Sequence, residues 1–166
     1  MEYEIYAVTS IRSPGKSNGC AIFLVRAYND GPKWQRMYRI ICRRQSKNSA
    51  ALMAVAAAAE YVRKINQKIA PDDTVVLRIR TESGYVKSGY YWMRKWKQAG
   101  WKTAKGTPVR NREYWEKLEN ETRCFSVTFV DPDRRTQEQL KKRADLEKME
   151  MDTKTEKMKM KGDRGA

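Results

Sequence analysis

The 166 residues of this chain include 35 lysines and arginines, 20 acidic residues and no histidine, which gives a net charge of +15. This length favours one domain with a proper core, and the charge favours a polyanionic partner. The lack of histidine excludes histidine-based catalytic triads and histidine metal ligands.

The first half of the chain predicts three strands, a long helix and a fourth strand. The predicted strands cover residues 4–9, 20–25, 36–42 and 74–80. The first three form an antiparallel meander, and the fourth is β-branched and is expected to be the central parallel strand. Ser46 or Asn48 can cap the helix, which runs to about residue 67 and is rich in alanine. A turn over residues 70–73 follows it.

The second half predicts three more helices and one strand. The predicted helices cover residues 82–97, 110–120 and 136–151, and the strand covers residues 124–130. We expect the first of these helices to be broken near Gly89, and a basic loop to occupy residues 100–108. Residues 151–166 are expected to form a charged, disordered tail, which leaves residues 1–150 as the folded domain. The element order predicts an α/β fold with a mixed sheet and helices on both faces.

The three cysteines, Cys20, Cys42 and Cys124, form neither a zinc-binding pattern nor a disulfide framework. We expect buried free thiols in a reducing cytoplasm. No signal peptide is visible, and the longest apolar run, residues 50–59, is too short to span a membrane. A membrane partner is therefore not expected.

The positive charge is concentrated in one segment, residues 87–112, which we call the basic handle. It holds eight lysines and arginines and no acidic residue. Its lysines are expected in solvent. Trp92 and Trp96 are four residues apart on a helix and share one face, so they can pack in the core; this interpretation is favoured for Trp96 and is evenly balanced for Trp92.

Several motifs of this chain resemble those of type 1 ribonuclease H. Glu82-Ser83-Gly84-Tyr85-Val86-Lys87 resembles the family's acidic residue ahead of a tyrosine–valine pair. Gly100-Trp101-Lys102-Thr103-Ala104 resembles its basic handle, and residues 48–54 resemble the start of its first helix. Ser13-Pro14-Gly15 resembles its first glycine-rich turn. The resemblance extends over about residues 4–148.

The resemblance implies a five-stranded mixed sheet with helices on both faces and a basic handle that holds an RNA–DNA hybrid. In this family four carboxylates hold two divalent metal ions ~4 Å apart that cut the RNA. Here the four positions correspond to Val8 (or Ala7, if the loop is aligned without a gap), Ala51, Glu82 and Ala144, with Asp145 beside the last. Glu82 is the only retained acid, so no catalytic residue is assigned. Glu82 and Asp145 are weak metal-ligand candidates, and Glu82 alternatively serves the start of a helix.

The resemblance and the charge pattern together predict a set of nucleic-acid contacts. These are Asn48, Lys87, Trp92, Lys95, Lys97, Trp101, Lys102, Lys105 and Arg110. Asn48 resembles the family's minor-groove asparagine, and a plain helix cap is the equal alternative. Duplex shape and 2′-hydroxyl groups would then decide the preference, which leaves RNA–DNA hybrid and double-stranded RNA both open.

Three hypotheses for function follow. The first is a catalytically inactive, cytoplasmic ribonuclease H-like protein that binds RNA–DNA hybrid or structured RNA within a nucleoprotein complex and needs no cofactor. The second is an altered nuclease that holds one Mg²⁺ or Mn²⁺ ion with Glu82 and Asp145, and with Asp133 as a further candidate ligand. The third is a structural subunit that docks on RNA or on a protein partner.

Overall fold

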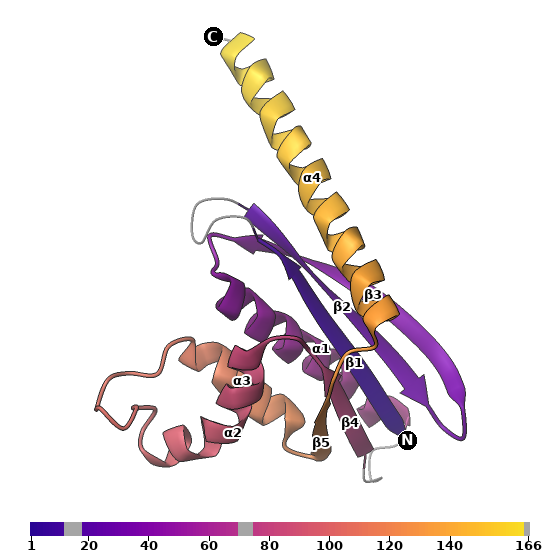
Figure 1. The fold of residues 1–166 in the computed structure, drawn as a ribbon, viewed down its shortest axis with the longest axis vertical. Helices are drawn as coiled ribbons and strands as arrows, with labels where there is room; N and C mark the ends of the chain where they lie inside the picture. Colours follow the sequence, from indigo (N-terminus) through magenta and orange to yellow (C-terminus); the bar gives the residue numbers. More distant parts are fainter. Residues whose placement is uncertain (12–17, 70–74, 165–166) are drawn as a thin grey trace.

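The computed structural model describes residues 1–11, 18–69 and 75–164. Its centre is a five-stranded mixed sheet with the strand order β3-β2-β1-β4-β5 (Figure 1). The strands are β1 (Glu2–Ser10), β2 (Asn18–Tyr28), β3 (Pro32–Arg43), β4 (Val75–Arg80) and β5 (Phe125–Val130). The first three pair antiparallel, while β1, β4 and β5 run parallel. The predicted sheet is confirmed, with β4 between the two other parallel strands.

In the part of the chain that the structure describes, four helices cover the two faces of this sheet. They are α1 (Lys47–Ile69), α2 (Gly84–Gln98), α3 (Arg112–Thr122) and α4 (Arg134–Arg164). Alternate residues of β1 point to opposite faces. Ile5 and Ala7 join the core beneath α1, whereas Tyr6 and Val8 pack with Leu140 of α4. Figure 1 shows α4 crossing the sheet and continuing beyond it. The predicted helices on both faces are therefore confirmed.

Small side chains let α1 lie close to the sheet. Ala50, Ala54 and Ala58 are fully buried, together with the larger Leu52 and Val62. Alanine keeps a high helix propensity and occupies little volume, so the helix backbone can approach the strands. This close packing places the N-terminus of α1 beside the end of β1.

The break predicted near Gly89 is wrong, because α2 is continuous from Gly84 to Gln98. Gly89 is instead the place where the ring of Trp115 packs on α2. A β-carbon added at Gly89 would lie 2.1 Å from Cη2 of that ring. The glycine therefore provides space for a neighbouring helix and does not interrupt its own.

Two further expectations need correction. Helix α4 continues to Arg164, whereas the sequence predicts a disordered segment from residue 151. Hydrogen bonds one turn apart, such as Lys148 Nζ to Asp152 Oδ2 at 2.8 Å, support this extension. Cys20 and Cys42 are buried as predicted, but Cys124 is exposed, just before β5 begins at Phe125. The boundary between residues 150 and 151 stays a prediction.

Some predictions fall on parts of the chain that the structure does not describe. The turn over residues 70–73, the first residue of the fourth strand and the Ser13-Pro14-Gly15 motif lie outside the described residues. In the ranges that are described, no helix combines the length and the apolar character needed to cross a membrane.

Candidate functional site

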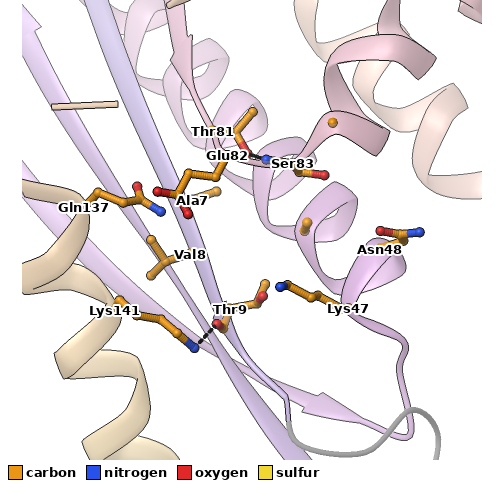
Figure 2. A pocket seen from close by; sticks show the side chains of 12 residues that line it. Ala7, Val8, Thr9, Lys47, Asn48, Thr81, Glu82, Ser83, Gln137 and Lys141 are labelled. Atoms are coloured by element: carbon orange, nitrogen blue, oxygen red, sulfur yellow. Dashed lines mark hydrogen bonds between the residues drawn. The ribbon is translucent and has the colours of Figure 1, made fainter. Parts of the chain in front are cut away.

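A cavity of about 340 Å³ opens at the edge of the sheet where β1 and β4 end. Ala7, Val8 and Thr9 of β1 form its floor. The first residues of α1 and α2 border it, and Gln137 and Lys141 of α4 complete it from the opposite face of the sheet (Figure 2). The cavity thus collects side chains from four elements that are far apart in the sequence.

Three of the four positions predicted for carboxylates meet at this cavity. Val8 and Ala51 line it together with Glu82, the only acidic residue among its lining residues. Ala144 is not among them, because it lies fully buried where α4 packs on the other face of the sheet. Helix α4 instead contributes Gln137 and Lys141 to the cavity, and Gln137 is the one closer to the start of the helix. Ala144 therefore does not share the cavity with the other three positions.

Asp145 and Asp133, the other two acids of the nuclease hypothesis, are engaged elsewhere. Asp145 accepts hydrogen bonds from Ser10 Oγ at 2.6 Å and from Lys141 Nζ at 3.1 Å. Although burial raises the pKa of the Asp145 carboxyl, these hydrogen bonds outweigh that effect and lower it. Asp133 caps α4 by accepting from Thr136 N at 3.0 Å, which lowers the Asp133 pKa.

The divalent metal pair implied by the resemblance does not fit this donor set. Two hard cations close together need several anionic oxygen ligands to offset their mutual repulsion. The cavity supplies one carboxylate, and Lys47 and Lys141 add positive charge. Within residues 1–11, 18–69 and 75–164, no group of three or more acidic, cysteine or histidine side chains could hold a metal ion.

Glu82 lies just outside α2 and is exposed. The helix is capped by Ser83, whose side chain accepts from Val86 N at 3.1 Å. The helix-start function considered for Glu82 therefore belongs to its neighbour. Figure 2 shows the Glu82 carboxylate pointing into the cavity, on the same side as the amide of Gln137.

Asn48 does not cap α1 either. Ser46 caps α1, because its hydroxyl accepts from Ser49 N at 3.1 Å. Asn48 is exposed at the rim of the cavity, and among the described residues its side chain has no hydrogen-bond partner. The structure thus answers the question of the cap, while the contact between Asn48 and nucleic acid stays a prediction.

Lys47 and Lys141 are site residues that the sequence reasoning missed. Figure 2 shows both side chains reaching toward Thr9, one from α1 and one from α4. Lys141 Nζ donates to Thr9 O at 2.8 Å, which holds it beside the cavity. Lys47 could have been predicted, because it directly precedes Asn48, which was already a candidate contact residue. Lys141 had no such signal, because the packing of α4 decides which of its faces meets β1.

The basic handle comprises α2 from Lys87 onward and the loop that leads to α3, and this loop extends from the body of the fold (Figure 1). Its base is held by the hydroxyl of Tyr85, which accepts from Asn111 Nδ2 at 3.0 Å and from Trp115 Nε1 at 3.3 Å. Trp96 packs edge-on against Trp115, with ring centroids 5.6 Å apart. The packing expected for Trp96 is therefore present.

The predicted contact residues of the handle divide into exposed and buried groups. Trp92 is 50% exposed, and Lys95 Nζ lies 4.7 Å from its ring centroid. Trp101 is only 7% exposed, so its ring supports the loop and offers no free face to a nucleic acid. Lys87 and Lys97 form ion pairs with Asp131 and Glu119. The remaining lysines and arginine are exposed, namely Lys95, Lys102, Lys105 and Arg110.

Comparison with known proteins places this arrangement in context. The family model for RNase H matches residues 2–145. The ribonuclease H of Ehrlichia chaffeensis is 31% identical over 118 residues, which cover 70% of each chain. Other curated relatives are matched over about half their length, at 52% for Ehrlichia ruminantium and 53% for Vibrio cholerae.

Solved structures share the fold. LC9-RNase H1, a type 1 RNase H with the type 2 active-site motif, superimposes with a TM-score of 0.64 at 22% identity, covering 87% of this chain and 69% of that one. A foamy viral protease–reverse transcriptase in complex with RNA/DNA hybrid gives 0.61 at 18% identity, covering 86% of this chain and 18% of that one. At these low sequence identities, the structural similarity shows a shared fold and nothing more.

Proposed function

Because this chain belongs to the RNase H family, we propose that it binds RNA–DNA hybrid or structured RNA and does not cleave it. The observation that carries the proposal is the cavity at the end of β1, which combines one carboxylate with two lysines. The binding unit is a single domain over residues 1–150 of a cytoplasmic protein, which acts within a nucleoprotein complex.

The binding half of the proposal is supported by the basic handle. Its exposed cations can neutralise phosphates and release counterions, which gives affinity that falls with salt. Asn48 lies at the cavity rim, at the position that resembles the minor-groove asparagine. The foamy viral protease–reverse transcriptase, which shares the fold, is seen in complex with RNA/DNA hybrid, and this is consistent with the proposed ligand class. Shape and 2′-hydroxyl contacts are then the source of selectivity.

The inactive half of the proposal is supported by charge. Metal-assisted cleavage of a phosphodiester requires cations that stabilise both the attacking and the leaving oxygen. Val8 and Ala51 supply no ligand, and Glu82 alone gives one negative charge against those of Lys47 and Lys141. A divalent cation entering the cavity would find a single carboxylate beside Lys47, which is unpaired among the described residues, with Lys141 only partly offset by Asp145, so no cofactor is proposed.

A second function is favoured by the names of the relatives, which are ribonucleases H. In this alternative the chain is an altered nuclease that uses Mg²⁺ or Mn²⁺ with Glu82, Asp145 and Asp133. Glu82 carries its carboxylate in the cavity, as this function requires. Asp145 and Asp133 would have to give up their present hydrogen bonds to join it.

The proposal is tested with labelled RNA–DNA hybrid, double-stranded RNA, double-stranded DNA and single strands. Binding is measured over a range of salt, and cleavage is followed with Mg²⁺ and with Mn²⁺. We expect tighter binding of hybrid or double-stranded RNA at moderate salt and no cleavage. Metal-dependent cleavage that Glu82→Ala abolishes would establish the nuclease instead. Equal, salt-sensitive binding of every ligand would favour a structural subunit that docks on RNA or on a protein partner.

A further inference from the structure

We propose that the cavity at the end of β1 binds a phosphate group of the nucleic-acid backbone directly, through Lys47 and Lys141, without a divalent metal. The inference rests on the proposed function and gives it a second point of attachment, separate from the basic handle. The two lysines then supply the positive charge that metal ions would otherwise bring to the phosphate.

The two lysines are placed for this task from opposite faces of the sheet. Lys141 Nζ is held by the carbonyl oxygen of Thr9 and by Asp145, which belongs to a neighbouring cavity. Asp145 offsets part of the Lys141 charge. Lys47 has no acidic partner among the described residues, so its full charge is available to a ligand.

Two helices, α1 and α2, begin at the cavity. Lys47 and Asn48 open α1, and Ser83 caps α2, which begins at Gly84. Helix α4 begins further back along β1, where Asp133 N donates to the hydroxyl of Tyr6. The N-terminus of a helix carries partial positive charge and unpaired N–H groups, both of which favour an anion. The backbone field therefore has the same sign as the lysines.

Gln137 is independent evidence that a ligand belongs here. The residue is only 9% exposed, and its side-chain oxygen is buried without a hydrogen-bond partner among the described residues. A buried polar atom without a partner destabilises a fold, so its presence calls for a partner from outside the chain. Oxygen and nitrogen of the amide are assigned from their surroundings. In either orientation the amide can meet a backbone segment, which offers phosphate oxygens as acceptors and a 2′-hydroxyl as a donor.

The opposing charge in the cavity is Glu82, whose carboxylate is exposed to solvent. Water screens exposed charges, those of Lys47 and Lys141 as well as that of Glu82, so the balance among them decides which ion the cavity favours. Lys47, unpaired among the described residues, the partly offset Lys141 and the N-terminal ends of α1 and α2 outweigh this single charge. The cavity thus favours an anion over a cation.

The test compares two double variants that lose equal charge. Lys47→Gln with Lys141→Gln removes the cavity lysines. Lys68→Gln with Lys142→Gln removes exposed lysines from the same two helices, outside the cavity. Affinity for RNA–DNA hybrid is measured in EDTA and in Mg²⁺ at several salt concentrations, and thermal unfolding shows that each variant is folded.

We expect the cavity variant to bind about tenfold more weakly than the control variant, and its salt slope to fall by about 1 for each phosphate that it no longer neutralises. Wild-type affinity should be the same in EDTA and in Mg²⁺. Equal affinities of the two variants, or a tenfold requirement for Mg²⁺, would overturn the inference while leaving the proposed function intact. Failure of the wild type to bind hybrid would overturn both.

A further experiment distinguishes a site for a nucleic-acid backbone phosphate from a site for free inorganic phosphate. Inorganic phosphate at millimolar concentration is added to the wild type and to the cavity variant, and thermal unfolding is followed. We expect little protection of either, because a single free phosphate lacks the sugar and base contacts of a strand. Strong protection of the wild type alone would show a site for free phosphate and would overturn the assignment to backbone.

Discussion

Gly89 and Trp115 are packed so closely that a β-carbon on Gly89 would lie 2.1 Å from Cη2 of the Trp115 ring. Trp115 is fully buried and cannot move away without opening the contact between α2 and α3. The orientation of the basic handle, which includes most of α2 and the loop to α3, depends on this contact.

Gly89→Ala is therefore expected to destabilise the protein, although alanine is the better helix former. Overpacking of this kind costs about 1–3 kcal/mol, more than the propensity gain returns. Gly84→Ala is the matched control, because nothing lies within 4 Å of its added methyl group. Chemical denaturation measures both. A Gly89→Ala variant as stable as the wild type would contradict the close packing.

The two tryptophans of α2 are expected to act differently. Trp92→Ala removes a half-exposed ring and should weaken hybrid binding with little change in stability. Trp96→Ala removes the ring that packs on Trp115 and should lower the free energy of unfolding by about 3 kcal/mol. Denaturation and binding titrations on both variants check this assignment. If Trp92→Ala lowered the stability and Trp96→Ala weakened only hybrid binding, the assignment would be wrong.

Acid stability depends on Glu60 of α1. Hydrogen bonds from Lys117 of α3 at 2.6 Å and from Lys64 at 2.8 Å lower the pKa of Glu60 to about 2. The folded-state pKa is below the unfolded one, so this pairing stabilises the protein above about pH 5, and the benefit is lost as the pH falls toward about pH 2.

Glu60→Gln should consequently reduce stability at neutral pH and flatten its decline in acid. Thermal unfolding midpoints between about pH 7 and pH 2 measure the effect. Glu138→Gln, which removes an acid from an exposed pair on α4, provides the comparison. Parallel curves for the wild type and Glu60→Gln would rule out the contribution of this pairing.

Removal of the cavity carboxylate discriminates between the two proposed functions. Under the binding function, Glu82→Gln relieves repulsion of a phosphate and should tighten hybrid binding in EDTA by about fivefold or less. Under the nuclease function, the same variant loses its metal ligand and its cleavage. Weaker binding in EDTA after this substitution would contradict the anion-binding character of the cavity.

The C-terminal part of α4 is expected to be dispensable for folding. Among the residues of α4 whose side chains the structure describes, Met151 is the last that packs against the core, and residues 153–158 are exposed. A chain that ends after Asp152 should unfold at the same temperature as the full chain. A large drop in the unfolding midpoint would place the domain boundary beyond residue 150.

The alternating apolar pattern and turn residues predict all five strands and the alanine-rich helix, because these signals are local in the chain. The same pattern underestimates the length of α4, since its extension is held by pairs one turn apart without an apolar face. It also mistakes Gly89 for a helix break, because the neighbour that explains this glycine, Trp115, is distant in the sequence.

By itself the sequence determined the family and the fold, because the motifs lie at recognisable positions. It also determined that Val8 and Ala51 are apolar at two of the positions where the family carries carboxylates. Only the tertiary structure decided which side chains of α4 meet β1. The helix starts at Arg134, so Gln137 and Lys141 face the cavity while Ala144 is buried further along the helix. The position of a helix along a sheet is set by packing, which no local pattern specifies.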